Sequence, residues 1–423
     1  MTLTKRTQRN LIGALVASAL MHTTVVFADD YSDARAELVA AYQAEDYSAM
    51  QLAAQKAVIA RPEYPGALFN LALAYTLNGK HRDSLRILGR LAEKGIDFGV
   101  AELDEFEALR DLDAWDTYIA RVEALSEPVG ISNVISTYPE ANFVPEGIAI
   151  DEDGHLILGS IRQGQIVKLA PDAEILLDRG QHWSVFGMRF HSDGSLWFAS
   201  AAVPQLSDVG DDEGKTGLFR FDLSKGEITR AAVLPQYEPN QVLGDLIIAD
   251  DNTIYATDSL TGGIYRYYID SNEFEVLAER GKLGSPQGLV LDEGGGYLYV
   301  ADYTGGLHRV STQDGSVVRL RVDASISDYG IDGLYRYGEE LIVIQNGIRP
   351  HRVAALQLGE DGLHIASSRL LAANLEAFDE PTLGVVRGSE FFFVANSHWN
   401  RFDRENRLPQ GLSGPIVLRV SLD

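Results

Sequence analysis

The sequence contains no cysteine, which excludes disulfide bonds, thiolate metal ligands and a lipid-modified cysteine anchor. It also lacks a Gly-x-Ser-x-Gly elbow, a phosphate-binding loop and a His-Glu-x-x-His motif, so three common catalytic signatures are missing. Positive charge is scarce: 36 Lys and Arg against 61 Asp and Glu give a net charge of -25. Such an acidic surface repels nucleic acid and anionic membranes, and we expect neither as a partner.

The N-terminus has the pattern of a secretory signal peptide. A basic segment, Lys5 to Arg9, precedes an apolar run over residues 11–20 that is too short to span a bilayer. Val26 to Ala28 then supplies small or aliphatic residues at the usual cleavage positions. We expect residues 1–28 to be removed and the protein to be periplasmic or secreted, with no membrane span after cleavage. An uncleaved membrane anchor is the alternative.

At 423 residues the chain is too long for one ordinary core, and two domains are expected. The first, over residues 29–125, is predicted to be helical because Ala and Leu recur at spacings of three and four. Tyr42 and Tyr75 lie 33 positions apart in two self-similar stretches, and a degenerate third unit follows from Phe106. This resembles tetratricopeptide repeats, whose unit is two antiparallel helices.

The short helical repeat stack has two interpretations. It could offer a groove to a protein partner, or it could serve as a spacer or brace for the second domain. We favour the second interpretation, because about three repeats present little concave surface. Residues 126–133 are expected to be the linker.

A pattern of short strands recurs six times after the linker, about every 40 to 58 residues. Each unit opens with a tight turn, followed by two apolar strands and a third strand that contains or ends in Arg or Lys. The openings are Pro145-Glu146-Gly147, Phe186-Gly187-Met188, Gly244-Asp245-Leu246, Pro286-Gln287-Gly288, Ile331-Asp332-Gly333 and Pro381-Thr382-Leu383. Such periodicity is typical of propeller blades, so residues 134–423 are predicted to form a six-bladed β-propeller.

The sixth unit supplies only three strands before Asp423. The isolated strand expected at Val134 to Tyr138 should complete that blade by pairing with the strand around Ile416 to Val420, because closure removes exposed sheet edges. The predicted fold is therefore an α plus all-β chain of two domains, with the propeller closed by its own N-terminal strand.

Propeller geometry places the openings on one rim of the ring, together with the loops that follow the second strands. The loops over 201–216 and 397–414 are much longer than their counterparts there. Long loops on one face of a rigid scaffold indicate a lid over a site. The opposite rim carries short hairpin turns with little room for function, and His155, His191 and His364 are set aside because they lie away from the functional rim.

The residue inside each opening turn should point towards the channel mouth. These residues are Glu146, Phe186, Gly244 with Asp245 beside it, Gln287, Asp332 and Thr382. Carboxylate and amide oxygens suit a hard cation, so Glu146, Asp245, Gln287 and Asp332 are candidate ligands. Without a cation, at least one carboxyl should keep its proton. The alternative is that each acidic residue caps its own blade.

Other polar residues on this rim are candidate substrate contacts. They are His182, Trp183, Arg349, His351, His398 and Trp399. A histidine there could act as a general base or bind an anion, although a loop histidine is more often a surface residue. Four residues recur where the second strands end, which favours a structural turn role: Asp258, Asp302, Asn346 and Asn396.

The propeller region resembles the senescence-marker-protein/gluconolactonase family. The resemblance rests on residues 143–148, on 285–289 with 299–302, and on 331–334. It implies a divalent cation at the channel mouth, held by a Glu of the first blade, Asn of the middle blades and a catalytic Asp of the fifth blade. Glu146 and Asp332 match that Glu and Asp. The Asn positions differ, since Gln287 stands in the fourth blade and Gly244, next to Asp245, in the third.

We therefore expect a metal-dependent lactone or ester hydrolase with calcium as the first choice of cation, and magnesium, manganese or zinc as alternatives. Asp332 would be the base for water. The competing interpretation is a non-catalytic propeller that binds a ligand or a protein partner at its rim, with the helical repeats as an interaction module.

Overall fold

The computed structural model describes residues 30–130, 133–169, 172–235 and 240–423. The predicted signal peptide lies outside these residues. In the part of the chain that is described, no helix is long and apolar enough to cross a membrane. The chain divides into two compact units, and each is described by itself. The first contains the described residues up to Glu127 with Ala324–Tyr329 and Ile348–Pro350; the second contains Pro128–Asp323, Gly330–Gly347 and His351–Asp423.

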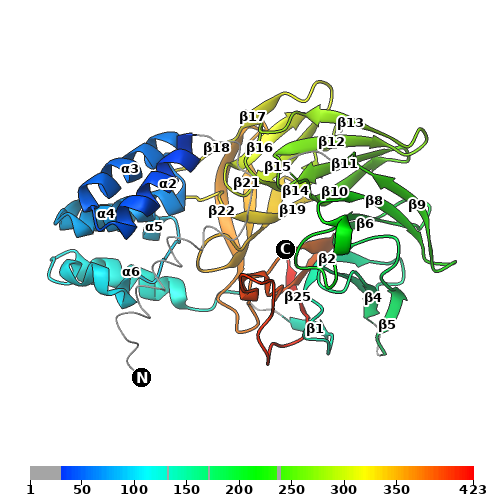
Figure 1. Cartoon of the computed structure of the whole chain (residues 1–423), viewed down its shortest axis with the longest axis horizontal. Coiled ribbons are helices and arrows are strands. Elements are labelled where there is room, and N and C mark those ends of the chain that lie inside the picture. The colour runs from blue at the N-terminus through cyan, green and yellow to red at the C-terminus, as the bar shows by residue number, and fades with distance from the viewer. Residues whose placement is uncertain (1–29, 131–132, 170–171, 236–239) are drawn as a thin grey trace. The chain divides into compact units, whose positions relative to one another are not determined.

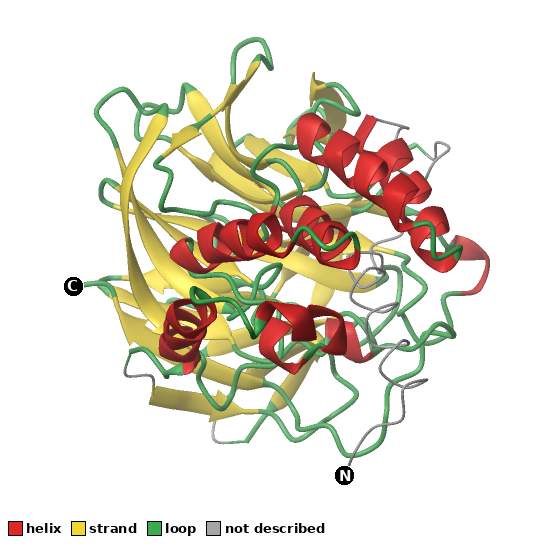
Figure 2. Cartoon of the chain, turned by 90° about the vertical axis from the view of Figure 1, so that its left-hand side faces the viewer, coloured by secondary structure: helices red, strands yellow, loops and turns green. Residues whose placement is uncertain are grey.

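The first unit is helical, as the spacing of Ala and Leu predicts, and its helices are red in Figure 2. Consecutive helices pack on one another around buried residues such as Leu38, Met50 and Phe106. The elements are α2 (Asp30–Gln43), α3 (Tyr47–Ala60), α4 (Pro65–Leu77), α5 (His81–Glu93), η1 (Val100–Glu102), η2 (Asp104–Leu109) and α6 (Trp115–Ser126).

Local sequence explains where these helices begin. Asp46 caps α3, because its Oδ1 accepts a hydrogen bond from the Ala49 N–H at 2.9 Å. Pro65 stands in the first turn of α4, where a missing N–H costs nothing. Between residues 94 and 114 the helical region is irregular, in the part where the sequence predicts a degenerate third unit. Gly95 and Gly99 there adopt positive φ, and only 3-10 turns form before α6. The resemblance to tetratricopeptide repeats stays a prediction.

The described residues of the second unit form six sheets, confirming the predicted propeller (Figure 1). The first is β2 (Pro145–Ile150), β3 (Leu156–Ser160), β4 (Ile166–Leu169) and β5 (Glu174–Leu177). The second is β6 (Ser184–Phe190), β7 (Leu196–Ala201), β8 (Thr216–Asp222) and β9 (Glu227–Val233). The third is β10 (Leu243–Asp250), β11 (Thr253–Asp258), β12 (Gly263–Tyr268) and β13 (Glu273–Ala278).

The remaining three sheets complete the ring. The fourth is β14 (Pro286–Leu291), β15 (Tyr297–Asp302), β16 (Gly306–Ser311) and β17 (Val317–Arg319). The fifth is β19 (Ile331–Tyr337), β20 (Glu340–Gln345), β21 (Arg352–Leu358) and β22 (His364–Ala373), with the short β18 (Arg321–Val322) parallel to β22. The sixth is β23 (Gly384–Arg387), β24 (Glu390–Val394), β25 (Ile416–Ser421) and β1 (Asn133–Thr137).

Ring closure follows the predicted pairing. β1 runs antiparallel to β25, with Asn133 opposite Arg419 and Thr137 opposite Ile416. The innermost strand of each blade contacts that of the next, and β23 contacts β2, so the ring is complete. Glycines permit this close approach: a Cβ at Gly147 would lie 2.1 Å from the Phe186 carbonyl oxygen of the next blade.

Candidate functional site

A β-bulge directs the opening residues of the first five blades towards the channel mouth. The register between first and second strands shifts at the openings, for example between Pro145 and Ile148 and between Ile331 and Leu334. A bulge twists the strand and re-aims the side chain that it carries. Glu146 and Asp332 sit within these two shifts, at the positions that the sequence pattern singles out.

Thr382 joins the two predicted carboxylates of the first and fifth blades. Its hydroxyl oxygen lies 2.8 Å from Glu146 Oε1 and 2.9 Å from Asp332 Oδ2. A hydroxyl has a single hydrogen and can donate to only one of these oxygens at a time. The second contact is a hydrogen bond only if the other carboxyl is protonated and donates to Thr382. The geometry therefore implies one proton held between Glu146 and Asp332.

Electrostatics favours the same protonation. Burial raises the pKa of Glu146 well above its ordinary value, and the charge of Asp332 raises it further. Hydrogen bonds from Trp399 and Thr382 act in the opposite direction. Burial also raises the pKa of Asp332, while hydrogen bonds from Thr382 and Asn346 act in the opposite direction. The expectation that uncompensated carboxyls would retain a proton agrees with both the distances and these shifts.

Asn346 contributes to this site, a role that sequence reasoning missed. Its side-chain N–H₂ donates to Asp332 Oδ2 at 2.7 Å and to the Pro381 carbonyl oxygen at 3.0 Å. The sequence pattern grouped Asn346 with the strand-end residues. In the fourth blade, Asp302 lies opposite Pro286, and in the fifth blade Gln345 lies opposite Ile331. Gln345 is therefore the counterpart of Asp302, and Asn346 lies one position beyond the strand-end residue. A one-residue slip sends a side chain to the other face.

The Asn346 side chain also provides the clearest sign that a ligand fits here. Its Oδ1 is buried and has no hydrogen-bond donor among the described residues. An orphaned buried oxygen is costly unless something satisfies it. A hard cation is coordinated by carboxylate and amide oxygens, so the chemistry of Glu146, Asp332 and Asn346 suits a divalent ion.

The other two predicted ligands have protein partners. Asp245 is almost fully buried, and its Oδ2 lies 3.2 Å from Arg189 Nη2. Burial raises the pKa of Asp245, and the charge of Arg189 opposes this. Gln287 is partly buried and donates to Ser285 Oγ at 3.0 Å. The structure thus joins Glu146 to Asp332 through Thr382, while Asp245 forms an ion pair and Gln287 bonds within its own blade.

Of the predicted substrate contacts, Trp399 reaches the site. Its indole N–H donates to Glu146 Oε2 at 2.6 Å, and the side chain is partly buried. The neighbouring His398 is buried and adopts a left-handed backbone conformation with φ 62°. Its ring nitrogens lie 2.8 Å from Asp379 Oδ2 and 3.0 Å from the Ser413 carbonyl oxygen. His398 therefore holds the loop in place.

The remaining candidates lie in other environments. His182 is buried against Phe198 and Phe219, with Nε2 2.6 Å from the Gly164 carbonyl oxygen. Trp183 is also buried, and its indole N–H donates to Asp212 Oδ2 at 3.0 Å.

Arg349 and His351 lie after the second strand of the fifth blade. Arg349 is exposed, belongs to the first compact unit, and its carbonyl oxygen accepts the Asp97 N–H at 2.8 Å. His351 is partly buried.

Two of the four strand-end residues, Asp258 and Asp302, cap the turn that follows them, as their recurrence indicates. Asp302 Oδ1 accepts backbone N–H groups of Ser285, Thr304 and Gly305. Asp258 Oδ1 makes comparable bonds, and Asn396 Oδ1 accepts the Ile416 N–H at 2.7 Å. Asp258 and Asp302 thereby tie the residues before the opening of their blade to the turn after its second strand, whereas Asn396 joins the two ends of the long loop in the sixth blade.

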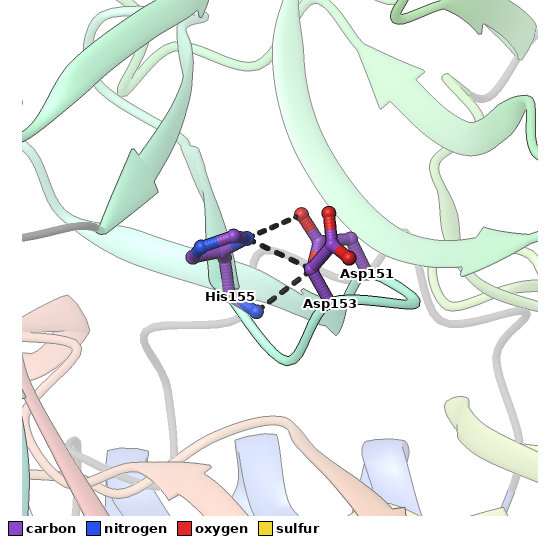
Figure 3. Close-up of side chains that lie close together, drawn as sticks. All are labelled: Asp151, Asp153 and His155. Atoms are coloured by element: carbon purple, nitrogen blue, oxygen red, sulfur yellow. Dashed lines mark hydrogen bonds and ion pairs between the residues drawn. The ribbon is translucent and has the colours of Figure 1, made fainter.

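A second group with metal-binding potential lies on the opposite rim, which the sequence analysis set aside. Asp151, Asp153 and His155 offer ligand atoms within 4.8 Å of one another (Figure 3). Glu146, Asp245 and Asp332 do not form such a group in the described part of the chain. However, Asp151 already accepts the His155 backbone N–H at 2.7 Å and lies 3.2 Å from Lys168 Nζ.

The corresponding turn of the second blade also holds a carboxylate beside a basic residue, although at another position of the turn. His191 stands where the first blade has Asp151, and Asp193 Oδ1 accepts the Ser195 N–H at 2.9 Å while Arg220 lies beside the carboxylate. An arrangement repeated between blades, with a basic partner each time, favours a hairpin-stabilising role for Asp151 over metal binding.

Comparison with known proteins identifies a family for part of the propeller. The model of the SMP-30/Gluconolactonase/LRE-like region matches residues 187–326. The chain resembles that family. The resemblance drawn from the sequence is thereby confirmed, and the matched part contains Asp245 and Gln287 but ends before Asp332. No curated protein shows significant sequence similarity to the chain.

Several solved structures are similar over the propeller at low identity. The PQQ-bound aldose sugar dehydrogenase from Streptomyces coelicolor is 14% identical with a TM-score of 0.47, covering 70% of this chain and 100% of its own. A catalytically inactive virginiamycin B lyase from Staphylococcus aureus with quinupristin is 14% identical with a TM-score of 0.46, covering 69% and 100%. A protein of unknown function from Bacteroides thetaiotaomicron is 11% identical with a TM-score of 0.47, covering 70% and 73%.

Proposed function

We propose that the protein is an exported, metal-dependent lactone or ester hydrolase whose site is the channel mouth. The observation that carries the proposal is the pair Glu146 and Asp332, brought from the first and fifth blades to one Thr382 hydroxyl. Two buried carboxyls that share a proton form the kind of site that a divalent cation can occupy by displacing that proton. Glu146 and Asp332 would hold the cation, with the orphaned Asn346 oxygen as the third donor.

A bound divalent cation, with calcium as the first candidate, would supply Lewis acidity that polarises the ester carbonyl. The chain's own part is to prepare the water. Thr382 and Asn346 both contact Asp332 Oδ2, which leaves Oδ1 to accept a proton from water. As the water oxygen bonds to the carbonyl carbon, its proton passes to Asp332. The lactone C–O bond then breaks, and the leaving oxygen takes the proton from Asp332.

The test combines metal binding with turnover. After chelator treatment, calcium should raise the melting temperature, by an amount equivalent to about 2.7 kcal/mol of stability at a hundredfold excess over the dissociation constant. The protein should hydrolyse a simple lactone such as dihydrocoumarin. Asp332→Asn should abolish turnover, whereas Glu146→Gln should weaken the calcium response first. Gln287→Asn, which supplies the family's residue type, should strengthen it.

Asp153→Asn is a matched control, because it removes an exposed carboxyl from the group on the opposite rim. It should leave both the calcium response and turnover unchanged. Wild-type protein whose melting temperature ignores calcium, magnesium, manganese and zinc, and which hydrolyses no lactone, would exclude the hydrolase.

A small-molecule binding propeller without catalysis is the second candidate. This function is favoured by the Trp399 indole N–H, which donates to Glu146 Oε2 and so occupies one of the oxygens that would hold a cation. A ligand captured at this rim would not need a cation. Calcium titration separates the two functions, because only the hydrolase predicts a thermal shift that Glu146→Gln diminishes.

A further inference from the structure

The long loop after the sixth second strand inserts a side chain into the channel mouth. Besides its hydrogen bond to Glu146, the Trp399 ring lies 6.3 Å from the Phe186 ring and 6.2 Å from the Phe402 ring, centroid to centroid. Phe186 is the aromatic member of the ring of opening residues, and it is buried. Trp399 thus makes two kinds of contact in the site. Its flat apolar ring lies towards Phe186, and its indole N–H donates to the Glu146 carboxylate.

The base of this loop is anchored strongly. Arg401 forms two hydrogen bonds of 3.0 Å with the Asp379 carboxylate, which also contacts His398. Burial alone would raise the pKa of Asp379, but the hydrogen bonds from His398 and Arg401 outweigh it and lower that pKa. The Asn400 N–H donates to Glu380 Oε2 at 2.6 Å. These contacts lie beside Trp399 and fix the direction in which its ring enters the mouth.

The part of this loop around Asn406 is hydrogen-bonded to the second long loop, residues 201–216, and we call this set of contacts the clasp. Arg162 of the first blade donates to the carbonyl oxygens of Gln205 at 2.8 Å and Asn406 at 3.2 Å. The side chains of Gln205 and Asn406 also meet at 3.1 Å. The Arg162 guanidinium lies 5.9 Å from the centroid of the Phe402 ring. One arginine therefore joins both loops at the rim where the opening residues converge.

We propose that Trp399 is an internal ligand of the channel mouth, and that the molecule this site receives enters by replacing the indole. Such a ligand carries a flat apolar or aromatic ring to lie against Phe186 and an N–H or O–H group to reach Glu146. The proposal rests on the proposed function only in placing the external ligand at Glu146 and Asp332. It narrows the substrate class to aromatic or ring-bearing compounds. It also implies that the two loops joined by Arg162 must separate before such a compound can enter the site.

Free indole is the direct probe. Trp399→Ala leaves the space of one indole beside Glu146, so the variant should bind indole at least about tenfold more tightly than wild type by calorimetry, which corresponds to about one hydrogen bond. Adding Glu146→Gln to Trp399→Ala should remove most of that gain. Trp399→Phe keeps a ring without the N–H and should also bind indole more tightly than wild type, as should Arg162→Ala, which releases the clasp without touching Glu146.

Equal indole affinity in wild type and Trp399→Ala would overturn the proposal, as would a gain in affinity that Glu146→Gln leaves intact. If Trp399→Ala does not fold, an indole affinity equal to that of wild type in both Trp399→Phe and Arg162→Ala would overturn it instead. Indole binding needs no turnover and no cation. A protein that hydrolyses no lactone but binds indole in this way would therefore refute the hydrolase and retain the internal ligand.

Discussion

Thr382 shows how a single residue can decide the state of a site. Because its single hydroxyl contacts a carboxyl from each of two blades, Glu146 and Asp332 cannot both accept a hydrogen bond from Thr382 as carboxylates. The sequence placed Thr382 among the opening residues but gave no sign of this bridging role. Neither residue type nor spacing reveals which oxygens a hydroxyl will meet across the ring.

Replacing Thr382 by Val removes the bridge while preserving the shape of the side chain. Glu146 Oε1 then loses its contact with the hydroxyl, and Asp332 Oδ2 keeps only the Asn346 N–H, so the free energy of unfolding should fall by about 1–3 kcal/mol. Thr382→Ser keeps the hydroxyl and is the control. Denaturant unfolding of both variants distinguishes the causes: similar losses in Ser and Val would show that the methyl group, not the hydroxyl, matters.

His182 should make stability depend on pH. Burial lowers its pKa from the ordinary 6.5, with the nearby Arg179 adding to the effect. The unfolded chain therefore binds a proton at higher pH than the folded protein does, and the free energy of unfolding should decline as pH falls below about 6.5. His182→Phe, measured by denaturant unfolding between pH 5 and 8, should flatten this decline. A slope equal to that of wild type would contradict it, and His364→Gln serves as control.

At the scale of the strand, the sequence predicted well where the strands lie, but it predicted poorly which side chains bond to one another. Apolar runs located the first strand of every blade, because local chemistry governs where a strand forms. The openings are not the expected tight turns: five lie at β-bulges within strands, and residues 381–383 precede β23. The one-residue slip at Asn346 and the ion pair between Asp245 and Arg189 depend on bulges and on contacts between blades. Such contacts link residues far apart in the chain, and no local pattern encodes them.

The closing strand gives the test at this scale. β1 is largely exposed, with Val134 at 59% exposure, so its contribution comes from pairing with β25 more than from apolar burial. A chain beginning at Tyr138 should unfold at a lower denaturant midpoint and less steeply than one beginning at Pro128, because β25 becomes an open edge. Coincident unfolding curves for the two truncations would show that closure does not depend on β1.

At the scale of the whole molecule, export remains the prediction with the simplest test. The basic and apolar segments before Ala28 predict that the mature chain starts at Asp29. N-terminal sequencing of the protein recovered outside the cytoplasm should read Asp-Asp-Tyr. Recovery of a chain starting at Met1 in the membrane fraction would support the uncleaved anchor.

The pairing of β1 with β25 also governs the order of folding. Asn133 meets Arg419 only after nearly the whole propeller sequence has been synthesised, so the ring cannot close on a growing chain. Contacts this distant in sequence cost loop entropy before they contribute stability, which slows folding. Until then β25 and β1 both present unpaired backbone. We therefore expect closure to be a late event in folding, and an open β25 edge before it to expose the chain to aggregation.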